Sequence, residues 1–338
     1  MSNTFNVAVI GSGYWGPNLI RNFYQLPKVE LSYICDLSNE RLSHMASLYP
    51  DIAQTKDYKD ILQDTNVDAV CIATPVSTHF KLAWEALEAD KHVLLEKPMT
   101  ATGEEARKLT ELAEQKGKVL MVGHTFEYTA PINKLKEIID SGELGKILYI
   151  NMSWLNLGVF REDVNVVWDL APHNISLLNM LLKEEPRTIK AIGSAHYHEG
   201  KEDVAFLNVS YPDNLIAHIH LSWIDPAKTR KLTVVGDKKM AIFDDLNDTE
   251  PIKIFDKSII KQPYYESYGE FKLLYNWGDV YSPKIENTEP LKVQCSHFID
   301  CIEKGKTPQS DGVSGMRVVE ALEAAERSLK NNSEWVQL

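Results

Sequence analysis

The chain has 338 residues, of which 44% are hydrophobic and 25% charged, which is the balance of a folded protein long enough for two domains. Acidic residues outnumber basic ones by 48 to 36, and the net charge of −12 argues against nucleic acid or an anionic membrane surface as a partner. There is no apolar run of membrane-spanning length, no secretory signal and no CxxC pair among the four cysteines, so we expect a protein of the reducing cytoplasm without structural zinc.

Short apolar runs alternate with helical patterns over the first third of the chain. The predicted strands are Phe5–Ile10, Val29–Cys35, Ala69–Ala73, His92–Leu95 and Lys118–Val122. The predicted helices are Pro17–Gln25, Asn39–Leu48, Tyr58–Gln63, His79–Glu88 and Gly103–Gln115. Continuous apolar runs are typical of strands buried on both faces, so this alternation predicts an α/β domain with a doubly wound parallel sheet. We place this domain at residues 1–125.

The pattern then becomes that of an α+β domain with a large, mostly antiparallel open sheet, which we place at residues 126–308. Its predicted helices are Pro131–Asp140, Pro172–Leu182 and Val293–Lys304. Its predicted strands begin at Ile147 and include Lys190–Ala195, Ala205–Tyr211, Leu215–Trp223, Arg230–Val235 and Met240–Asp244, many of them joined by short turns. We interpret 245–287 as long loops. A last helix, Gly312–Asn331, lies in a segment, 309–338, that we expect to pack back on both domains.

A glycine motif follows the first strand directly, in the stretch Gly11-Ser12-Gly13-Tyr14-Trp15-Gly16. The glycines of GxGxxG allow a tight turn, close approach of a pyrophosphate and close packing of the next helix, whose N-terminus offers free N–H groups. Asp36 ends the second strand, at the spacing of an acid that binds the adenosine ribose. Strand, loop, helix and acid together predict a bound dinucleotide. We expect NAD rather than NADP because Asp36 would repel a 2′-phosphate, although a helix turn could bring Arg41 near.

Lys97 follows the strand His92–Leu95 within Glu96-Lys97-Pro98. Ligands of a doubly wound sheet bind beyond the carboxyl ends of its strands, so Lys97 would face the nicotinamide. Apolar surroundings there would move the pKa of the lysine toward neutrality. Position alone fits an ordinary surface lysine equally well.

Asp169 and His173 are four residues apart in a predicted helix and so can be neighbours on one face. A histidine that titrates near neutral pH suits proton transfer during alcohol oxidation. Asp169 also suits the N-cap of a helix that has Pro172 in its first turn. From these residues alone, a capping aspartate and an incidental histidine are the simpler interpretation.

Several motifs together resemble the Gfo/Idh/MocA family of NAD(P)-dependent oxidoreductases, nearly end to end. They are GSGYWG, Asp36, Ala73-Thr74-Pro75 with His79, Glu96-Lys97-Pro98, and Asp169 with His173. The resemblance implies an N-terminal Rossmann domain and a C-terminal open sheet. The inner face of that sheet would carry the substrate site, and its outer face would mediate a homodimer or homotetramer.

The resemblance also implies roles for individual residues. Lys97 would contact the reacting hydroxyl, and His173 would act as acid or base with Asp169 beside it. The opposite assignment, with Lys97 as the acid or base, stays open. Both would meet across the cleft between the domains. Glu96 and Thr74 would lie near the nicotinamide ribose, and the Lys97–Pro98 peptide would be cis. The residues expected at the cofactor are Gly11, Gly13, Tyr14, Trp15, Gly16, Asp36, Thr74, Pro75, His79, Glu96 and Lys97.

Three stretches resemble the branch that acts on nucleotide-linked or amino sugars, namely 123–128, 155–158 and 168–173. This likeness implies dehydrogenation at C3 of a UDP-N-acetylhexosamine. A diphosphate needs cations, for which Arg161, Lys228 and Arg230 are the candidates. The same residues fit ordinary surface charge equally well. The residues expected at the substrate are Arg161, Asn165, Asp169, His173, Lys228 and Arg230.

Other functions stay open from the sequence. An inositol or free-sugar dehydrogenase, or an NAD-dependent glycosidase without net redox, would use similar residues. A non-catalytic NAD-sensing protein would need neither Lys97 nor His173. The aromatic cluster Tyr264, Tyr265, Tyr268, Tyr275 and Trp277 fits packing, an oligomer interface or a sugar platform.

Two further patterns concern metals and assembly. His196 with His198, and His218 with His220, would each share a strand face, but no third ligand suggests itself, so we expect no metal. Apolar residues on both alternations of one strand suggest that the exposed sheet face is covered by another copy of the chain. Those residues are Leu215, Ile216, Ile219, Leu221 and Trp223.

Overall fold

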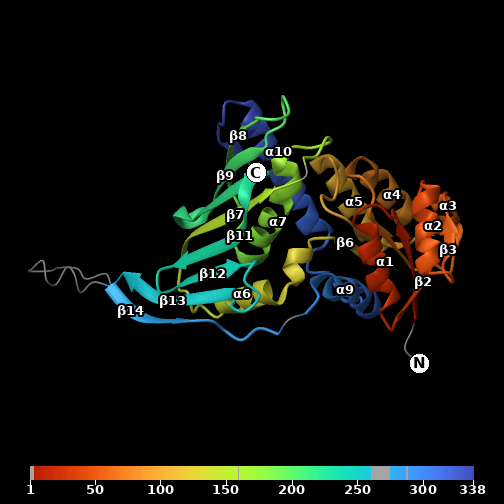
Figure 1. Ribbon diagram of the computed structural model, residues 1–338, viewed down its shortest axis with the longest axis horizontal. Helices are drawn as coiled ribbons and strands as arrows, with labels where there is room; N and C mark the ends of the chain where they lie inside the picture. Colours follow the sequence, from red (N-terminus) through yellow and green to blue (C-terminus); the bar gives the residue numbers. More distant parts are fainter. Residues whose placement is uncertain (1–3, 159, 260–274, 287) are drawn as a thin grey trace, which may run out of the picture. The chain divides into compact units, whose positions relative to one another are not determined.

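The computed structural model describes residues 4–158, 160–259, 275–286 and 288–338, and the chain divides into two compact units (Figure 1). Unit 1 comprises residues 1–129 and 288–320, and unit 2 comprises residues 130–287 and 321–338. The predicted combination of a parallel sheet and a second, mostly antiparallel sheet is confirmed.

Unit 1 is built on a six-stranded sheet in the order β3-β2-β1-β4-β5-β6, all of whose pairs are parallel. Its strands are β1 Phe5–Ile10, β2 Val29–Cys35, β3 Ala53–Thr55, β4 Ala69–Ile72, β5 His92–Leu95 and β6 Leu120–Val122. Its first helices are α1 Gly16–Tyr24, α2 Asn39–Leu48, α3 Tyr58–Gln63, α4 Val76–Glu88, α5 Gly103–Lys116 and the 3-10 turn η1 Thr125–Tyr128. The strand order reverses between β1 and β4, and ligands of such sheets bind at the carboxyl ends beside that reversal.

Helix α9, Pro290–Lys304, belongs to unit 1, although we expected residues up to 308 in the second domain. Its apolar face completes the core under β1 and β2, where the rings of Phe298 and Phe23 lie 6.4 Å apart. Helix α10, Gly312–Lys330, is shared between the units, with its first part in unit 1 and its last part in unit 2.

Unit 2 is built on a nine-stranded sheet in the order β14-β13-β12-β11-β7-β10-β9-β8-β15, in which the β7–β10 pair is parallel and the other pairs are antiparallel. Its strands are β7 Ile147–Leu157, β8 Thr188–Ser194, β9 Val204–Ser210, β10 Ile216–Ser222, β11 Ile224–Gly236, β12 Met240–Asp244, β13 Ile252–Ile259, β14 Tyr275–Tyr281 and β15 Val336–Gln337. Its helices are α6 Ala130–Asp140, α7 Val166–Leu181 and the 3-10 turn η2 Pro212–Asn214.

The interpretation of 245–287 as long loops was wrong where β13 and β14 lie. In the first half of β13, the buried Ile252 and Ile254 alternate with the half-buried Lys253 and Phe255, which is the period of a half-buried strand. Strand β14 is mostly exposed at the sheet edge, so it carries almost no such pattern; Tyr275 and Trp277 are exposed there. Tyr264, Tyr265 and Tyr268 lie outside the described residues.

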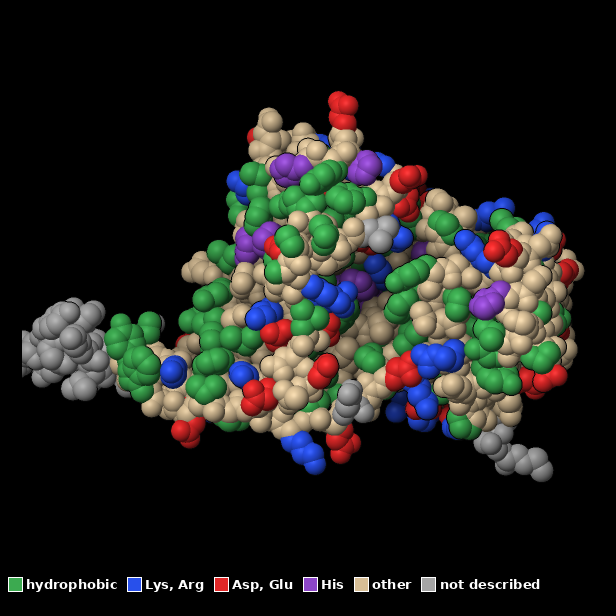
Figure 2. Space-filling view, in the orientation of Figure 1, with side chains coloured by type: hydrophobic (Ala, Val, Ile, Leu, Met, Phe, Trp, Pro, Cys, Tyr) green, Lys and Arg blue, Asp and Glu red, His purple; other side chains and the backbone are tan. Residues whose placement is uncertain are grey.

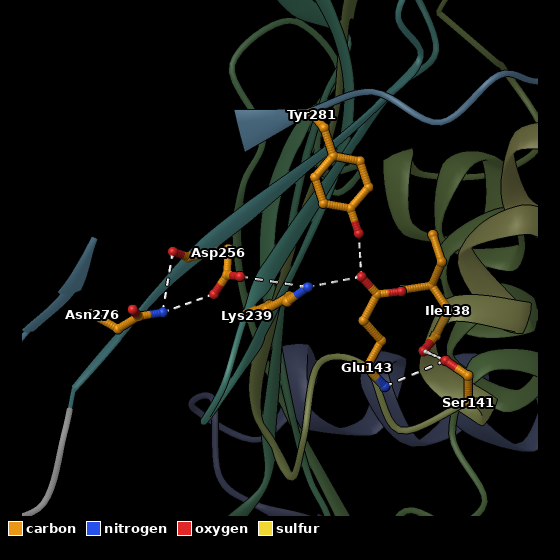
Figure 3. Close-up of polar contacts among 7 residues, drawn as sticks. All are labelled: Ile138, Ser141, Glu143, Lys239, Asp256, Asn276 and Tyr281. Atoms are coloured by element: carbon orange, nitrogen blue, oxygen red, sulfur yellow. Dashed lines mark hydrogen bonds and ion pairs between the residues drawn. The ribbon is translucent and has the colours of Figure 1, made fainter. Parts of the chain in front are cut away.

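A polar network holds this edge of the sheet together (Figure 3). The carboxylate of Glu143, just before β7, accepts hydrogen bonds from the hydroxyl of Tyr281 on β14 and, at 3.1 Å, from the Nζ of Lys239 beside β12. Lys239 also lies 3.7 Å from the carboxylate of Asp256 on β13, which accepts at 2.8 Å from the amide of Asn276. The network therefore links four segments that are far apart in sequence.

The two faces of the unit 2 sheet differ in their burial. On β10 the side chains of Ile219 and Leu221 are buried, whereas Ile216 is 47% exposed on the other face together with His218 and His220. Of the five residues taken as evidence for a covered outer face, only Ile216 therefore lies on the open face.

All four cysteines are buried, unpaired and located in unit 1. Burial raises the pKa of the Cys35 thiol to about 12 and raises those of Cys71, Cys295 and Cys301 as well. Among the described helices, none combines the length and the apolar character needed to cross a membrane.

Candidate functional site

The turn between β1 and α1 accepts no side chain at two of its glycines. A Cβ on Gly16 would lie 2.1 Å from the carbonyl oxygen of Gly11, and a Cβ on Gly11, whose φ is +98°, would lie 2.6 Å from the carbonyl oxygen of Ala73. At Gly13 a Cβ would meet nothing closer than the Arg41 guanidinium at 3.6 Å. The loop is therefore closely packed at Gly11 and Gly16, whereas the space beside Gly13 is open. This arrangement fits the pyrophosphate of a dinucleotide. Tyr14 is almost fully exposed on this loop.

Asp36 is buried at the end of β2, and its carboxylate is held by the same loop. Its Oδ2 accepts from the backbone N–H and the hydroxyl of Ser12, at 2.8 and 3.0 Å, and its Oδ1 accepts from the N–H of Ser38 at 2.9 Å. Burial alone would raise the pKa of Asp36, but these hydrogen bonds and the charge of Arg41 lower it. The carboxylate is thus ionised and fixed where an adenosine ribose would bind.

A surface pocket opens beside Asp36. Arg41 lies on it, with Nη1 at 3.6 Å from the Asp36 carboxylate. The pocket is lined by Ser12, Gly13, Pro17, Asp36, Leu37, Ser38, Glu40, Arg41, His44 and Met45. Residues of the glycine loop and the acid at the end of β2 both line this pocket. It therefore suits the adenosine half of the expected dinucleotide.

His79 lies in the interior rather than on the pocket surface. One ring nitrogen is 2.8 Å from the carbonyl oxygen of Thr74 and the other 2.9 Å from that of Pro98. The ring thus links the Thr74-Pro75 loop, which begins α4, to the loop of Lys97. Burial lowers the pKa of His79 despite these two carbonyl contacts.

Glu96 sits between the glycine loop and Lys97. Its Oε2 accepts from the backbone N–H of Lys97 at 3.3 Å, and its carboxylate accepts a hydrogen bond from the Trp15 indole. A Cβ on Gly123 would lie 2.8 Å from its Oε1, so a larger residue at this position would push the carboxyl group aside. The Lys97–Pro98 peptide that follows is cis, as expected.

Burial dominates the titration of the groups around Lys97. It raises the pKa of Glu96 to about 7, against the opposing charge of Lys97 and the hydrogen bonds from Lys97 and Trp15. Burial, assisted by the charge of Lys97, lowers the pKa of His124 to about 3. Near neutral pH His124 is therefore uncharged and Glu96 is close to half-ionised.

Helix α7 begins at Val166, six residues before Pro172, so the expectation that Asp169 caps it was wrong. The N-cap is Asn165, whose side-chain oxygen accepts from the N–H groups of Val167 and Trp168 at 3.2 Å. Pro172 lies inside the helix. The amide of Asn165 also donates to the carboxylates of Glu202 and Glu326, which gives this predicted substrate ligand an internal structural role.

Asp169 and His173 are both half-buried on α7, one turn apart. The Oδ2 of Asp169 accepts from the indole of Trp223 at 3.0 Å, and its Oδ1 lies 3.6 Å from the Nε of Arg161. A neutral donor and a cation thus orient the carboxylate on the face of the helix that it shares with His173.

The remaining predicted ligands of the substrate, Lys228 and Arg230, both lie on β11. Arg230 pairs with Asp245, at 3.2 Å, whereas Lys228 is exposed in an irregular part of the strand. Of the two histidine pairs, His196 and His198 differ from expectation, because they lie in the β8–β9 loop outside the named strands, whereas His218 and His220 share a face of β10 as expected, next to Phe206.

Sequence reasoning missed Gly123 and Trp223 as residues of this site, and it did not foresee what the indole of Trp15, an expected cofactor residue, would contact. Gly123 follows β6 directly and gives no signal beyond its place next to a strand. The indoles of Trp15 and Trp223 needed hydrogen-bond acceptors once half or fully buried, but only the fold shows that these are Glu96 and Asp169.

We expect Glu96→Gln to stabilise the protein above neutral pH. The folded state keeps the Glu96 proton up to about pH 7, whereas the unfolded chain releases it near pH 4.3. Stability is therefore lost as pH rises through that interval, and the loss is complete above it. The amide removes this loss, so the Tm should rise by a few °C at pH 8, roughly the effect of 1–2 kcal/mol, and stay unchanged at pH 4.

Calorimetric scans of the wild type and Glu96→Gln at the two pH values provide the measurement. Glu111→Gln, on the exposed face of α5, is the matched control. An equal shift at pH 4 and pH 8 would contradict the buried titration of Glu96.

Two family models match the chain. The model of an oxidoreductase family with an NAD-binding Rossmann fold matches residues 5–124, and that of the GFO/IDH/MocA C-terminal domain matches residues 132–242. Together they cover more than half of the sequence.

Two curated relatives with named activities are similar to part of this chain. UDP-N-acetylglucosamine 3-dehydrogenase of Acidithiobacillus ferrooxidans is 28% identical over 258 residues, which are 75% of this chain and 76% of that protein. Inositol 2-dehydrogenase of Salmonella typhimurium is 28% identical over 192 residues, 55% of this chain and 57% of that protein. The alignments with these two relatives thus span between about half and three quarters of their length.

Solved structures share the whole fold. The structure of the Acidithiobacillus ferrooxidans enzyme, GnnA, has a TM-score of 0.83 at 24% identity and covers 98% of this chain and 99% of its own. GenD2 from gentamicin A biosynthesis, in complex with NAD, has a TM-score of 0.83 at 23% identity and covers 100% and 97%. With both domain models matched in order, the chain belongs to the Gfo/Idh/MocA family of oxidoreductases.

Proposed function

We propose that this protein is an NAD-dependent sugar dehydrogenase that oxidises a secondary alcohol, with C3 of a UDP-N-acetylhexosamine as the favoured position. The observation that carries the proposal is the pairing of a glycine cradle and ionised Asp36 with Lys97 at the end of β5. The relative named UDP-N-acetylglucosamine 3-dehydrogenase, which aligns over 76% of its length, supports the choice of sugar.

The cofactor residues divide by the part of the dinucleotide that they would hold. The turn at Gly11, Gly13 and Gly16 would hold the pyrophosphate, and Asp36 the adenosine ribose. Glu96, which the Trp15 indole ties to the glycine loop, would lie by the nicotinamide ribose. Bound nicotinamide supplies the hydride acceptor of the reaction.

The protein side chains would handle the proton. Oxidation of a secondary alcohol removes a hydride from carbon and a proton from oxygen. His173 would take that proton, while Lys97 hydrogen-bonds the hydroxyl oxygen and stabilises its developing negative charge. Asp169, held by Trp223 and Arg161, would orient His173 or bind a sugar hydroxyl. The exchange of roles between Lys97 and His173 is the alternative.

An inositol dehydrogenase is the second candidate, because the Salmonella typhimurium relative of that name is also 28% identical. A glycosidase would cleave its substrate without accumulating NADH. Supplying UDP-N-acetylglucosamine, free sugars and inositols separately, and following NADH and glycoside cleavage, distinguishes the three.

With UDP-N-acetylglucosamine and NAD we expect steady NADH formation that depends on both proposed catalytic residues. In Lys97→Ala and His173→Ala, kcat should fall by about 10²–10⁴, the usual contribution of a positioned proton-transfer group. The Kd for NAD should stay unchanged, because neither residue would hold the pyrophosphate or adenosine. Absorbance at the NADH band and a fluorescence titration measure the two quantities.

Lys59→Ala, an exposed lysine on α3, is the control for loss of charge. Near wild-type turnover in Lys97→Ala would contradict the proposed mechanism. Oxidation of inositols but not of the UDP-sugar would make inositol, the second candidate, the substrate.

We expect NAD to be preferred over NADP by at least roughly tenfold in kcat/KM, the effect of about 1.4 kcal/mol. Asp36→Ala should narrow the gap by removing the charge that repels a 2′-phosphate. Arg41→Ala should widen it, because Arg41 is the cation 3.6 Å from that carboxylate. Steady-state kinetics with both cofactors decide, and equal efficiency in the wild type would refute the preference.

We also propose a homodimer or homotetramer that uses the open face of the unit 2 sheet. Phe206, Ile216 and Ile192 are exposed there, with His220 stacked on Phe206 at 4.3 Å. Figure 2 shows hydrophobic and histidine side chains together over β8 and β9. Such a surface is costly to leave in water.

Light scattering at micromolar concentration should therefore give at least twice the monomer mass. Phe206→Glu should reduce it by placing a charge in the apolar face, whereas Glu111→Gln should not. A monomeric wild type would rule out the assembly.

A further inference from the structure

Two surface loops of unit 2 are joined at the start of α7. One is the loop that precedes α7, and the other, 195–203, connects β8 and β9. The Nζ of Lys201 donates to the carbonyl of Glu162, and the backbone N–H of Val166 donates to the carbonyl of Glu202 at 2.9 Å. The β8–β9 loop is thus fixed to the helix that carries the proposed catalytic pair.

A buried aspartate anchors the backbone of that loop. Asp203 is 1% exposed, and its carboxylate accepts from the backbone N–H groups of His196 and Tyr197 at 2.7 and 3.0 Å. The Nδ1 of His196 lies 2.6 Å from its other oxygen. The side chain of Tyr197 is nevertheless 68% exposed. Because the backbone of Tyr197 is fixed, its exposed ring loses little conformational entropy when a ligand stacks on it.

Ring contacts run from this tyrosine toward Asp169. The ring of Phe160 lies 5.3 Å from that of Tyr197, 5.5 Å from that of His198 and 5.8 Å from that of Trp223. The Trp223 indole donates to the carboxylate of Asp169 at 3.0 Å. One continuous set of packed rings therefore joins an exposed aromatic surface to the proposed sugar site.

Arg161 adds a positive charge to the same surface. Its side chain is 52% exposed, with Nε at 3.6 Å from Asp169. Guanidinium groups bind phosphate oxygens by paired hydrogen bonds, and exposed aromatic rings stack with nucleobases of any sequence. A nucleotide-linked sugar would use both features at once, because it has a base to stack on the rings and a diphosphate to bind the guanidinium.

We propose that Tyr197 and Phe160 form the stacking site for the base of a nucleotide-linked sugar, with Arg161 on its diphosphate and the sugar directed to Asp169. This inference rests on the proposed function and assigns to unit 2 the choice between a nucleotide-linked and a free sugar. The β8–β9 loop, rather than the face that carries His173, then determines the class of substrate.

The test compares UDP-N-acetylglucosamine with N-acetylglucosamine 1-phosphate at saturating NAD. In Tyr197→Ala, kcat/KM for the UDP-sugar should fall about tenfold or more, within the range for loss of one base stack, while the value for the sugar phosphate stays unchanged. Tyr197→Phe keeps the ring and should resemble the wild type.

Calorimetric titration with UDP alone, also at saturating NAD, separates the site from the proposed reaction. If the wild type fails to oxidise the UDP-sugar but binds UDP about tenfold more tightly than Tyr197→Ala does, the nucleotide site stands and the proposed reaction falls. Equal UDP affinity of the wild type and Tyr197→Ala, no UDP binding by the wild type, or an equal loss of kcat/KM on both substrates would overturn the stacking site.

Discussion

The close approach of Gly16 to Gly11 is the constraint on which unit 1 depends. No Cβ fits between the start of α1 and the end of β1, so the helix begins directly above the strand and its free N–H groups face the loop. The same turn brings Trp15 to Glu96, and Glu96 accepts from the backbone of Lys97. A tight backbone turn at one strand end thus fixes the surroundings of a lysine at another.

The buried carboxyl group of Glu96 shows how close packing and chemistry combine at this point. Gly123 leaves the space that the group occupies, and the surrounding apolar residues hold its pKa at about 7. A larger residue at 123 would displace the carboxylate and, with it, the hydrogen bonds to Trp15 and Lys97. The geometry of the carboxyl group therefore depends on a residue that has no side chain.

The sequence predicted unit 1 well because strands buried on both faces leave uninterrupted apolar runs. Strand β3, whose residues are Ala-Gln-Thr, is too short and too polar to leave one. In unit 2 both Asn165 and Asp169 are good caps, and Asn165 is used because Glu202 and Glu326 also accept from its amide. Contacts such as Trp223 with Asp169 join segments 54 residues apart, and no local pattern records them.

The distribution of cysteines has a practical consequence. Unit 1 holds all four thiols, each buried and unpaired, and unit 2 has none. A thiol reagent can therefore react only when the core of unit 1 opens, and its rate measures that opening without any contribution from unit 2. The native chain carries its own probe for the local unfolding of the nucleotide-binding half, and the rate can be followed with and without dinucleotide.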